Sequence, residues 1–168
     1  PPSTSTKEID MNRTAVALAA AALTAFASLP AQAQAVRSER NMSLELANQI
    51  AAAGVAACAA NNYNVAVTVV DRAGSVRAVQ RADNAGPHTL AASHHKAFTS
   101  ASARNTTLAM MDAAQKNPAA ANLTDIPGFL LLGGGVPVKA GEEVIGAIGI
   151  GGAPGGHLDE QCALAAIE

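Results

Sequence analysis

The sequence predicts an α+β domain in which antiparallel strands pack against helices. Its elements follow in the order helix, hairpin, helices, three-strand meander and helix, without the regular strand–helix alternation of a doubly wound sheet. Of the 168 residues, 49% are hydrophobic and only 14% are charged, a composition that excludes a disordered chain. The roughly 135 residues that follow a predicted leader suit one ordinary domain.

In the first half of this domain the sequence predicts a helix and a β-hairpin. Ser43 is a suitable N-cap for an apolar, alanine-rich helix that ends at Asn61-Asn62. Residues 65–70 form a β-branched run, and residues 75–80 alternate between apolar and polar side chains. Between them, Gly74 can take a positive φ, so the two runs are expected to pair as a hairpin.

The second half predicts helices at residues 88–104 and 107–116, the latter ended by Asn117-Pro118. An irregular connection is expected over residues 119–127, and a glycine-rich loop over residues 151–156 leads into a closing helix at 158–167. Three further strands are expected at residues 129–132, 136–139 and 144–150. With the hairpin they make five antiparallel strands.

Residues 11–33 have the order of a secretory signal peptide. Arg13 precedes an apolar run that reaches Leu29, and Ala31-Gln32-Ala33 offers the small residues of a cleavage site, with a second site ending at Ala35. The run is about 15 residues, too short for the ~20 residues that span a bilayer. Residues 1–10 precede this start, and residues 36–168 form the single mature domain. We therefore expect a periplasmic or secreted protein.

Export affects the interpretation of Cys58 and Cys162. In an oxidising compartment the pair can form one disulfide, and the alternative is two small buried thiols. The chain has no C-x-x-C-H sequence, which excludes covalent attachment of a c-type haem, and no C-x-x-C pair that indicates zinc.

Several other function classes find no support. A net charge of −2 and the absence of Trp argue against a nucleic-acid interface. The glycine-rich segment has Pro154 where the dinucleotide-binding fingerprint needs glycine, and no G-x-S-x-G nucleophile elbow occurs. Asp71 and the other aspartates are scattered, most of them at turns, where Asp is favoured by its backbone hydrogen bonds.

The histidines are the most informative residues, because three of the four fall within eight positions, at His88, His94 and His95. Imidazole is a common ligand for haem iron and other transition metals, which makes His94 and His95 candidate metal ligands. Two adjacent histidines on a regular helix cannot both face one metal ion. The alternative is that they are solvated or satisfied within the core.

Helical spacing favours His95 slightly over His94. His95 shares a face with small residues, including Ala91 and Thr99, and this strip leaves room for a flat ligand. His94 lies next to Leu90 and Phe98, which are expected to be core residues.

From Ser43 to Ile167 the chain resembles the GlcG/HbpS family of haem-binding proteins. The resemblance rests on the order and spacing of several short motifs rather than on any one of them. These are Val69-Val70-Asp71-Arg72-Ala73-Gly74, Arg81-Ala82-Asp83-Asn84-Ala85, Lys96-Ala97-Phe98-Thr99, Gly134-Gly135-Val136-Pro137, Gly146-Ala147-Ile148-Gly149-Ile150 and Asp159-Glu160-Gln161-Cys162-Ala163. Asn84 stands where the family usually has glycine, and the His94-His95 pair is not part of its motif.

The resemblance implies a profilin-like α+β fold with a five-stranded antiparallel sheet, a homo-oligomer and non-covalent haem. One exported branch resembles an accessory to a membrane sensor kinase that responds to haem or oxidative stress. In such a protein His95, His94 or Thr99 would hold the iron, and Lys96 and Arg81 would be available to the haem propionates. The alanine-rich helices have faces that are nearly all apolar. This also predicts self-association, because monomers rarely expose large apolar patches.

Two other functions are compatible with the sequence. One is an enzyme acting on a small molecule, with Lys96, Arg81 and Asp83 in a pocket against the glycine-rich strand. The other is an oligomeric interaction protein without ligand chemistry.

Overall fold

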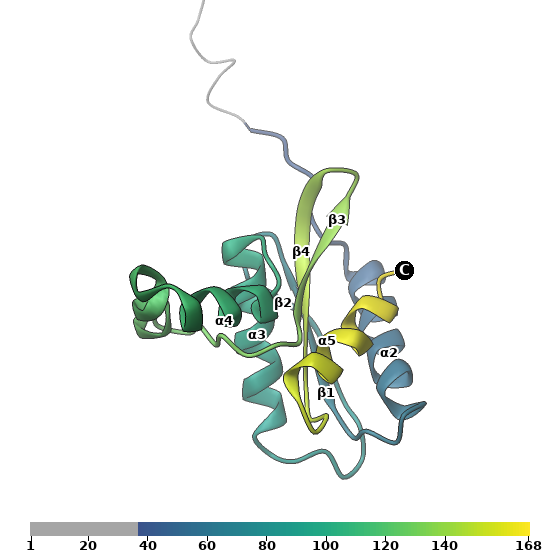
Figure 1. Cartoon of the computed structure of the whole chain (residues 1–168). Coiled ribbons are helices and arrows are strands. Elements are labelled where there is room, and N and C mark those ends of the chain that lie inside the picture. Colours follow the sequence, from purple (N-terminus) through teal and green to yellow (C-terminus); the bar gives the residue numbers. More distant parts are fainter. Residues whose placement is uncertain (1–36) are drawn as a thin grey trace, which may run out of the picture. The chain divides into compact units, whose positions relative to one another are not determined.

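A four-stranded antiparallel sheet in the order β2-β1-β4-β3 lies at the centre of the fold (Figure 1). The computed structural model describes residues 37–168, so the predicted signal peptide lies outside the described residues. The chain divides after Glu39, and Arg40–Glu168 forms the folded unit. The strands are β1 (Ala66–Asp71), β2 (Val76–Arg81), β3 (Gly135–Ala140) and β4 (Glu143–Gly151).

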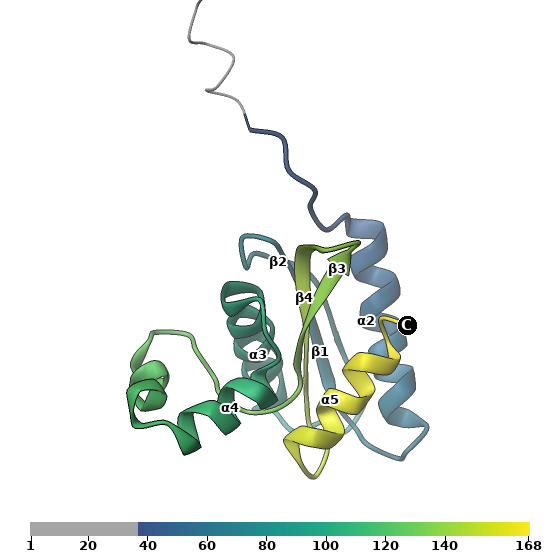
Figure 2. The same ribbon diagram turned by 45° about the horizontal axis from the view of Figure 1, so that its top comes forward.

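Helices cover both faces of this sheet (Figure 2). α2 (Leu44–Ala59) and α5 (Gly156–Ala165) pack on one face, against a core that includes Val67, Val69 and Ile148. α3 (Thr89–Ala103) packs on the opposite face, where Ala97 contributes to a second, smaller core cluster. α4 (Thr107–Lys116) follows α3 and leads into a 3₁₀ helix, η3 (Pro118–Asp125).

The prediction of a fifth strand at residues 129–132 is wrong. The backbone N–H of Leu130 donates to Thr99 Oγ1 of α3 at 2.8 Å, so this segment leans on the helix instead of extending the sheet. Phe129 also packs edge-on against Phe98, with ring centroids 6.2 Å apart. The connection before it is the 3₁₀ helix η3 rather than irregular chain, and Asn117 caps its first turn.

One row of residues across the sheet, two of them glycines, determines where α3 packs. Gly135, Gly149, Thr68 and Val79 face one another across β3, β4, β1 and β2. A Cβ on Gly149 would collide with the Ser93 carbonyl, and one on Gly135 would collide with that of Lys96, so the backbone of α3 rests directly on the two glycines. The helix therefore lies over β3, β4 and β1, and the same face of β2 is left uncovered.

The disulfide that the sequence left open is present. Cys58 in α2 and Cys162 in α5 are joined with Cα atoms 5.3 Å apart, across 104 residues of sequence. It joins two neighbouring helices on the same face of the sheet. Among the described residues, no helix combines the length and the apolar character needed to cross a membrane.

Candidate functional site

The residues from Ser93 to Lys96 leave α3 on different sides, although the rings of His94 and His95 lie with their centroids 5.6 Å apart. Successive side chains on a helix are turned by about 100°, and Ser93 faces the sheet, where its hydroxyl lies 2.8 Å from that of Thr68. His94 is therefore turned toward β2 and Lys96 toward β3, while His95 faces away from the sheet. His94 is half-buried, His95 is exposed and Lys96 is buried, in agreement with these directions.

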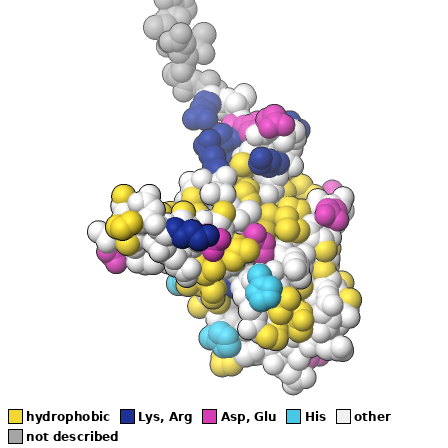
Figure 3. Space-filling view, in the orientation of Figure 1, with side chains coloured by type: hydrophobic (Ala, Val, Ile, Leu, Met, Phe, Trp, Pro, Cys, Tyr) yellow, Lys and Arg dark blue, Asp and Glu magenta, His cyan; other side chains and the backbone are white. Residues whose placement is uncertain are grey.

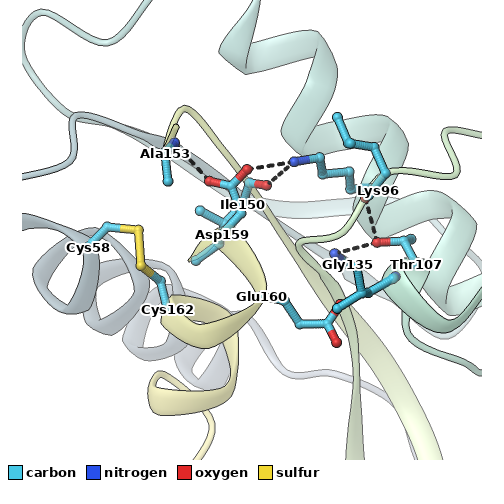
Figure 4. Close-up of polar contacts among 11 residues, drawn as sticks. Cys58, Lys96, Thr107, Gly135, Ile150, Ala153, Asp159, Glu160 and Cys162 are labelled. Carbon is cyan, nitrogen blue, oxygen red and sulfur yellow. Dashed lines mark hydrogen bonds and ion pairs between the residues drawn. A yellow bond between two sulfur atoms is a disulfide. The ribbon is translucent and has the colours of Figure 1, made fainter. Parts of the chain in front are cut away.

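The Lys96 side of α3 is closed and charged (Figure 4). Lys96 is 1% exposed, and its Nζ donates to Asp159 Oδ2 at 2.7 Å and to the Ile150 carbonyl at 2.9 Å. Asp159 Oδ1 in turn accepts the N–H of Ala153 at 2.9 Å. Burial raises the pKa of Asp159 above its ordinary value of 3.8, and the Lys96 ammonium opposes that rise.

The opposite side of α3 is open and apolar. The ring of Phe98 lies against Gly74 in the turn between β1 and β2, which places this side of the helix next to β2. Val76 and Val79 of β2 are 49% and 46% exposed, and Leu90, one turn before His94, is 41% exposed. We call this surface the α3/β2 face and define it by Val76, Val79, Leu90, His94, Phe98 and Arg81.

Arg81 lies at the end of the α3/β2 face. Its register partner is Ala66, on the sheet surface that carries Val79, and its guanidinium donates through Nε and Nη2 to the Ala85 carbonyl. The loop that supplies this carbonyl turns at Asn84, whose φ is 64°. Asparagine tolerates this left-handed conformation better than most residues other than glycine. Arg81 itself remains exposed.

Thr99 is engaged within the fold. It is buried, its hydroxyl donates to the His95 carbonyl at 2.7 Å, and the same oxygen accepts the N–H of Leu130. Its role in the structure is to hold the segment before β3 against α3.

The structure brings His94 and Arg81 to one face but separates them from Lys96. The ammonium of Lys96 is paired inside the fold, so it does not lie on an open surface where a propionate would reach it. For the same reason Lys96 does not share a pocket with Arg81 and Asp83, both of which are exposed beyond the other side of α3. The expectation that Leu90 is a core residue is wrong, which removes one of the two reasons to prefer His95, the other being the strip of small residues beside it.

Sequence reasoning missed Asp159 and Glu160, two buried carboxylates at the start of α5. Glu160 Oε2 accepts the N–H of Leu108 in α4 at 3.3 Å. Both stand in the motif Asp159-Glu160-Gln161-Cys162-Ala163, and its two adjacent acids beside a cysteine were the signal that could have pointed to them.

Two cavities of the described unit lie away from the histidines. Cavities of about 140 Å³ and 280 Å³ lie beside α5 and α2, and no histidine lines either of them. Between residues 37 and 168, every buried side-chain nitrogen or oxygen has a hydrogen-bond partner, and no group of three metal-ligating side chains gathers. Of the four histidines, His88, His95 and His157 are exposed and His94 is half-buried, so each has a surface open to a ligand.

Known proteins match this chain over nearly all of the folded unit. The model of a family described as "Haem degrading protein HbpS-like" matches residues 42–168. The protein GlcG of Escherichia coli K12 is 34% identical over 109 residues, which cover 65% of this chain and 80% of GlcG.

Solved structures of similar proteins have the same fold as this chain. A double mutant of Streptomyces reticuli HbpS superimposes with a TM-score of 0.76 at 37% identity, covering 84% of this chain and 94% of that one. The PduOC–haem complex has the same fold, with a TM-score of 0.67 at 23% identity, over 76% of this chain and 93% of PduOC. The antiparallel sheet, the helices on both of its faces and the matched length lead to one conclusion: the chain belongs to the HbpS-like, or GlcG/HbpS, family.

Proposed function

We propose that this protein binds haem non-covalently on the α3/β2 face, with His94 as the iron ligand. The observation that carries the proposal is the half-buried imidazole of His94 on the helix that covers the sheet face carrying exposed Val76 and Val79. Imidazole is the usual protein ligand of haem iron, and the macrocycle is an apolar plate that needs apolar surface on either side. The family description and the haem complex of a protein with this fold support the same ligand.

The other residues of the face suit the remaining parts of haem. Val76 and Val79 are exposed on the sheet surface and would offer contact to one side of the porphyrin. Arg81 is an exposed cation at the end of the face, where a propionate carboxylate would meet it. When bound, haem would supply redox and oxygen chemistry, and the protein's own part is to bind and orient it. His95 on the exposed side of α3 is the second candidate ligand.

The exposure of the apolar side chains on the α3/β2 face favours a homo-oligomer. Haem held only by a surface would keep its other side in water, whereas a second copy of the chain placed over the face would cover it. Exposed valines on an edge strand are also unusual in a monomer. We therefore propose self-association, with a mass by light scattering well above that of one chain as its test.

We also propose export to the periplasm or the cell exterior. The disulfide between Cys58 and Cys162 supports an oxidising compartment. Intact-mass analysis of the secreted protein is expected to show a chain that begins at Gln34 or Val36, and a retained Met11 would contradict this. The comparisons lend no support to a membrane sensor kinase as partner, and the proposal does not include one.

The binding proposal is tested by titrating haemin into the purified protein and recording its absorption spectrum. The wild type is expected to give a sharp, saturable Soret band. His94→Ala is expected to lower the affinity at least about tenfold, since each tenfold loss corresponds to about 1.4 kcal/mol. His95→Ala is expected to change it little.

His157→Ala is the matched control, because this exposed histidine of α5 lies outside the α3/β2 face. If His95→Ala abolishes the Soret band while His94→Ala preserves it, the ligand assignment passes to His95. If both variants keep the wild-type spectrum and affinity, neither histidine holds the iron. A broad band without saturation in the wild type would refute haem binding itself.

Haem degradation is the second candidate function, favoured by the description of the matching family. The same complex distinguishes it from storage or sensing. On addition of hydrogen peroxide, a degrading protein loses its Soret band and releases iron faster than free haemin does, whereas a binding protein protects the macrocycle.

A further inference from the structure

The inner face of α5 carries few large apolar side chains. Its buried residues are Asp159, Glu160, Cys162 and Ala163, whereas Leu164 is 43% exposed. Cys162 and Ala163 join the main hydrophobic core, but two carboxylates, a cysteine and an alanine bury less apolar surface than large aliphatic side chains would. Polar and covalent contacts therefore supply a large share of what holds α5 in place.

Those contacts are a few discrete links. Asp159 pairs with Lys96 of α3 and accepts the N–H of Ala153, which closes the loop before the helix. Glu160 accepts the N–H of Leu108. The remaining link is covalent, the Cys58–Cys162 disulfide to α2 (Figure 4).

One end of the disulfide faces a cavity. Cys162 lines the hollow of about 140 Å³ between α2 and α5, together with Asn61, Tyr63 and Gln161, whereas Cys58 is fully buried and does not line it. The cavity is smaller than the sites that hold drug-sized ligands, but it has polar side chains for the amino and carboxyl groups of a molecule such as free cysteine. Attack by an incoming thiolate is therefore possible at one sulfur atom of the pair.

We propose that Cys162 is a thiol-exchange site for small monothiols, and that reduction there releases α5 from the rest of the fold. The inference is independent of haem, because it involves neither the α3/β2 face nor any of its residues.

The exchange takes two thiol molecules. The thiolate of the first attacks Sγ of Cys162, the bond between the two cysteines breaks, and Cys58 leaves as a thiolate that takes up a proton. The second attacks the mixed disulfide, so that Cys162 becomes a thiol and the two small thiols leave as their disulfide. Two electrons pass to the protein, and the protons of the two thiols end on Cys58 and Cys162.

Loss of the covalent link leaves α5 held mainly by polar contacts. If α5 then opens, Asp159 leaves Lys96, and a lysine that is 1% exposed loses its carboxylate partner. The desolvated ammonium draws water in between α3 and β3, so the opening is expected to include the loop at residues 151–155.

The test treats the folded, oxidised full-length protein with free cysteine and traps the products with N-ethylmaleimide. Peptide mass analysis is expected to find the mixed disulfide on Cys162. Hydrogen exchange on the reduced protein is expected to show that amides of α5 and of residues 151–155 lose protection at least about tenfold, while β1 and β4 keep theirs.

A matched pair of variants tests the route through the cavity. Ala165→Leu adds bulk to the cavity lining and is expected to slow exchange with cysteine about tenfold, because the rate depends on access to the attacked sulfur. Ala56→Leu adds the same bulk at an exposed position of α2 outside the lining and is expected to leave the rate unchanged.

Three results would overturn the proposal. The first is an adduct on Cys58 instead of Cys162, and the second is equal rates for the two leucine variants. The third is reduction that leaves α5 as protected as before, or that exposes β1 and β4 together with it. Since the wild-type chain itself is measured, these outcomes do not depend on whether a cysteine variant folds.

Discussion

The two sides of helix α3 differ in almost every respect, although they belong to the same 15-residue helix. Toward β3, a buried lysine meets a buried aspartate at 2.7 Å, and glycines let the backbone pack in direct contact. Toward β2, valine and leucine side chains remain exposed beside a half-buried histidine. Figure 3 shows another face of the molecule, where hydrophobic side chains are also exposed and charges gather near the β3–β4 turn.

The contrast separates two uses of polar chemistry. Every buried side-chain donor and acceptor between residues 37 and 168 already has a hydrogen-bond partner. The buried Lys96–Asp159 pair therefore has a structural role, because removing one partner would leave the other as a buried, unpaired charge. An imidazole at the border of an uncovered apolar surface has a free side, and it is available to a ligand or to a second chain. Lys96 and His94, two positions apart, therefore have different surroundings because the helix turns them to different sides.

The largest effect is expected on the closed side. Lys96→Met leaves the Asp159 carboxylate buried without its cation and is expected to lower the free energy of unfolding by about 3–5 kcal/mol. Urea denaturation measures this change. Lys116→Met breaks an exposed pair with Asp112 on α4 and serves as control, with an expected change of about 0.5 kcal/mol or less. Equal costs for the two variants would show that burial does not distinguish these pairs.

The next effect concerns the glycines under α3. Gly149→Ala is expected to cost about 1–3 kcal/mol, because its Cβ collides with the backbone of the helix. Gly151→Ala places its Cβ 3.3 Å from that of Ala92 and is expected to cost less. Thermal unfolding compares the two. A less stable Gly151→Ala would mean that α3 rests on the sheet elsewhere.

A smaller effect is expected from pH. The pKa of Asp159 is raised on folding, so between pH 3.8 and the raised value the native protein binds more protons than the unfolded chain. Stability relative to Asp159→Asn is therefore greatest below pH 3.8 and falls as pH rises through this window, then levels off. Urea titrations of both proteins across the acid range test this. A relative stability that increases with pH would show that pairing with Lys96 outweighs burial.

The smallest effect on stability is expected on the open side. Val76→Thr with Val79→Thr keeps β-branched side chains at two exposed positions, so the free energy of unfolding should change by about 0.5 kcal/mol or less. The same variant is expected to weaken haemin binding and self-association, because it removes apolar surface from the α3/β2 face. Unchanged haemin affinity and unchanged mass by light scattering would exclude this face from both functions.

Local patterns were sufficient to predict much of this fold. Ser43 caps α2 through its hydroxyl, which accepts the N–H of Leu46. Gly74 takes a φ of 80°, and Asp71 accepts the N–H groups of Ala73 and Ser75, as the turn chemistry predicts. The apolar run at residues 129–132 was misjudged, because a buried threonine hydroxyl of α3 binds its backbone and no local pattern contains that contact.

The candidate site shows the same division. Its residue types, an imidazole pair with a nearby arginine, and the family resemblance follow from the sequence by itself, as do the elements that carry them. Only the tertiary structure decided that Lys96 pairs with Asp159, that Cys58 bonds to Cys162, and that β2 stays uncovered beside His94. The physical reason is that helix periodicity determines the angles between side chains, whereas the direction of the whole helix depends on what it packs against. Two glycines on β3 and β4, far from α3 in sequence, determine that direction.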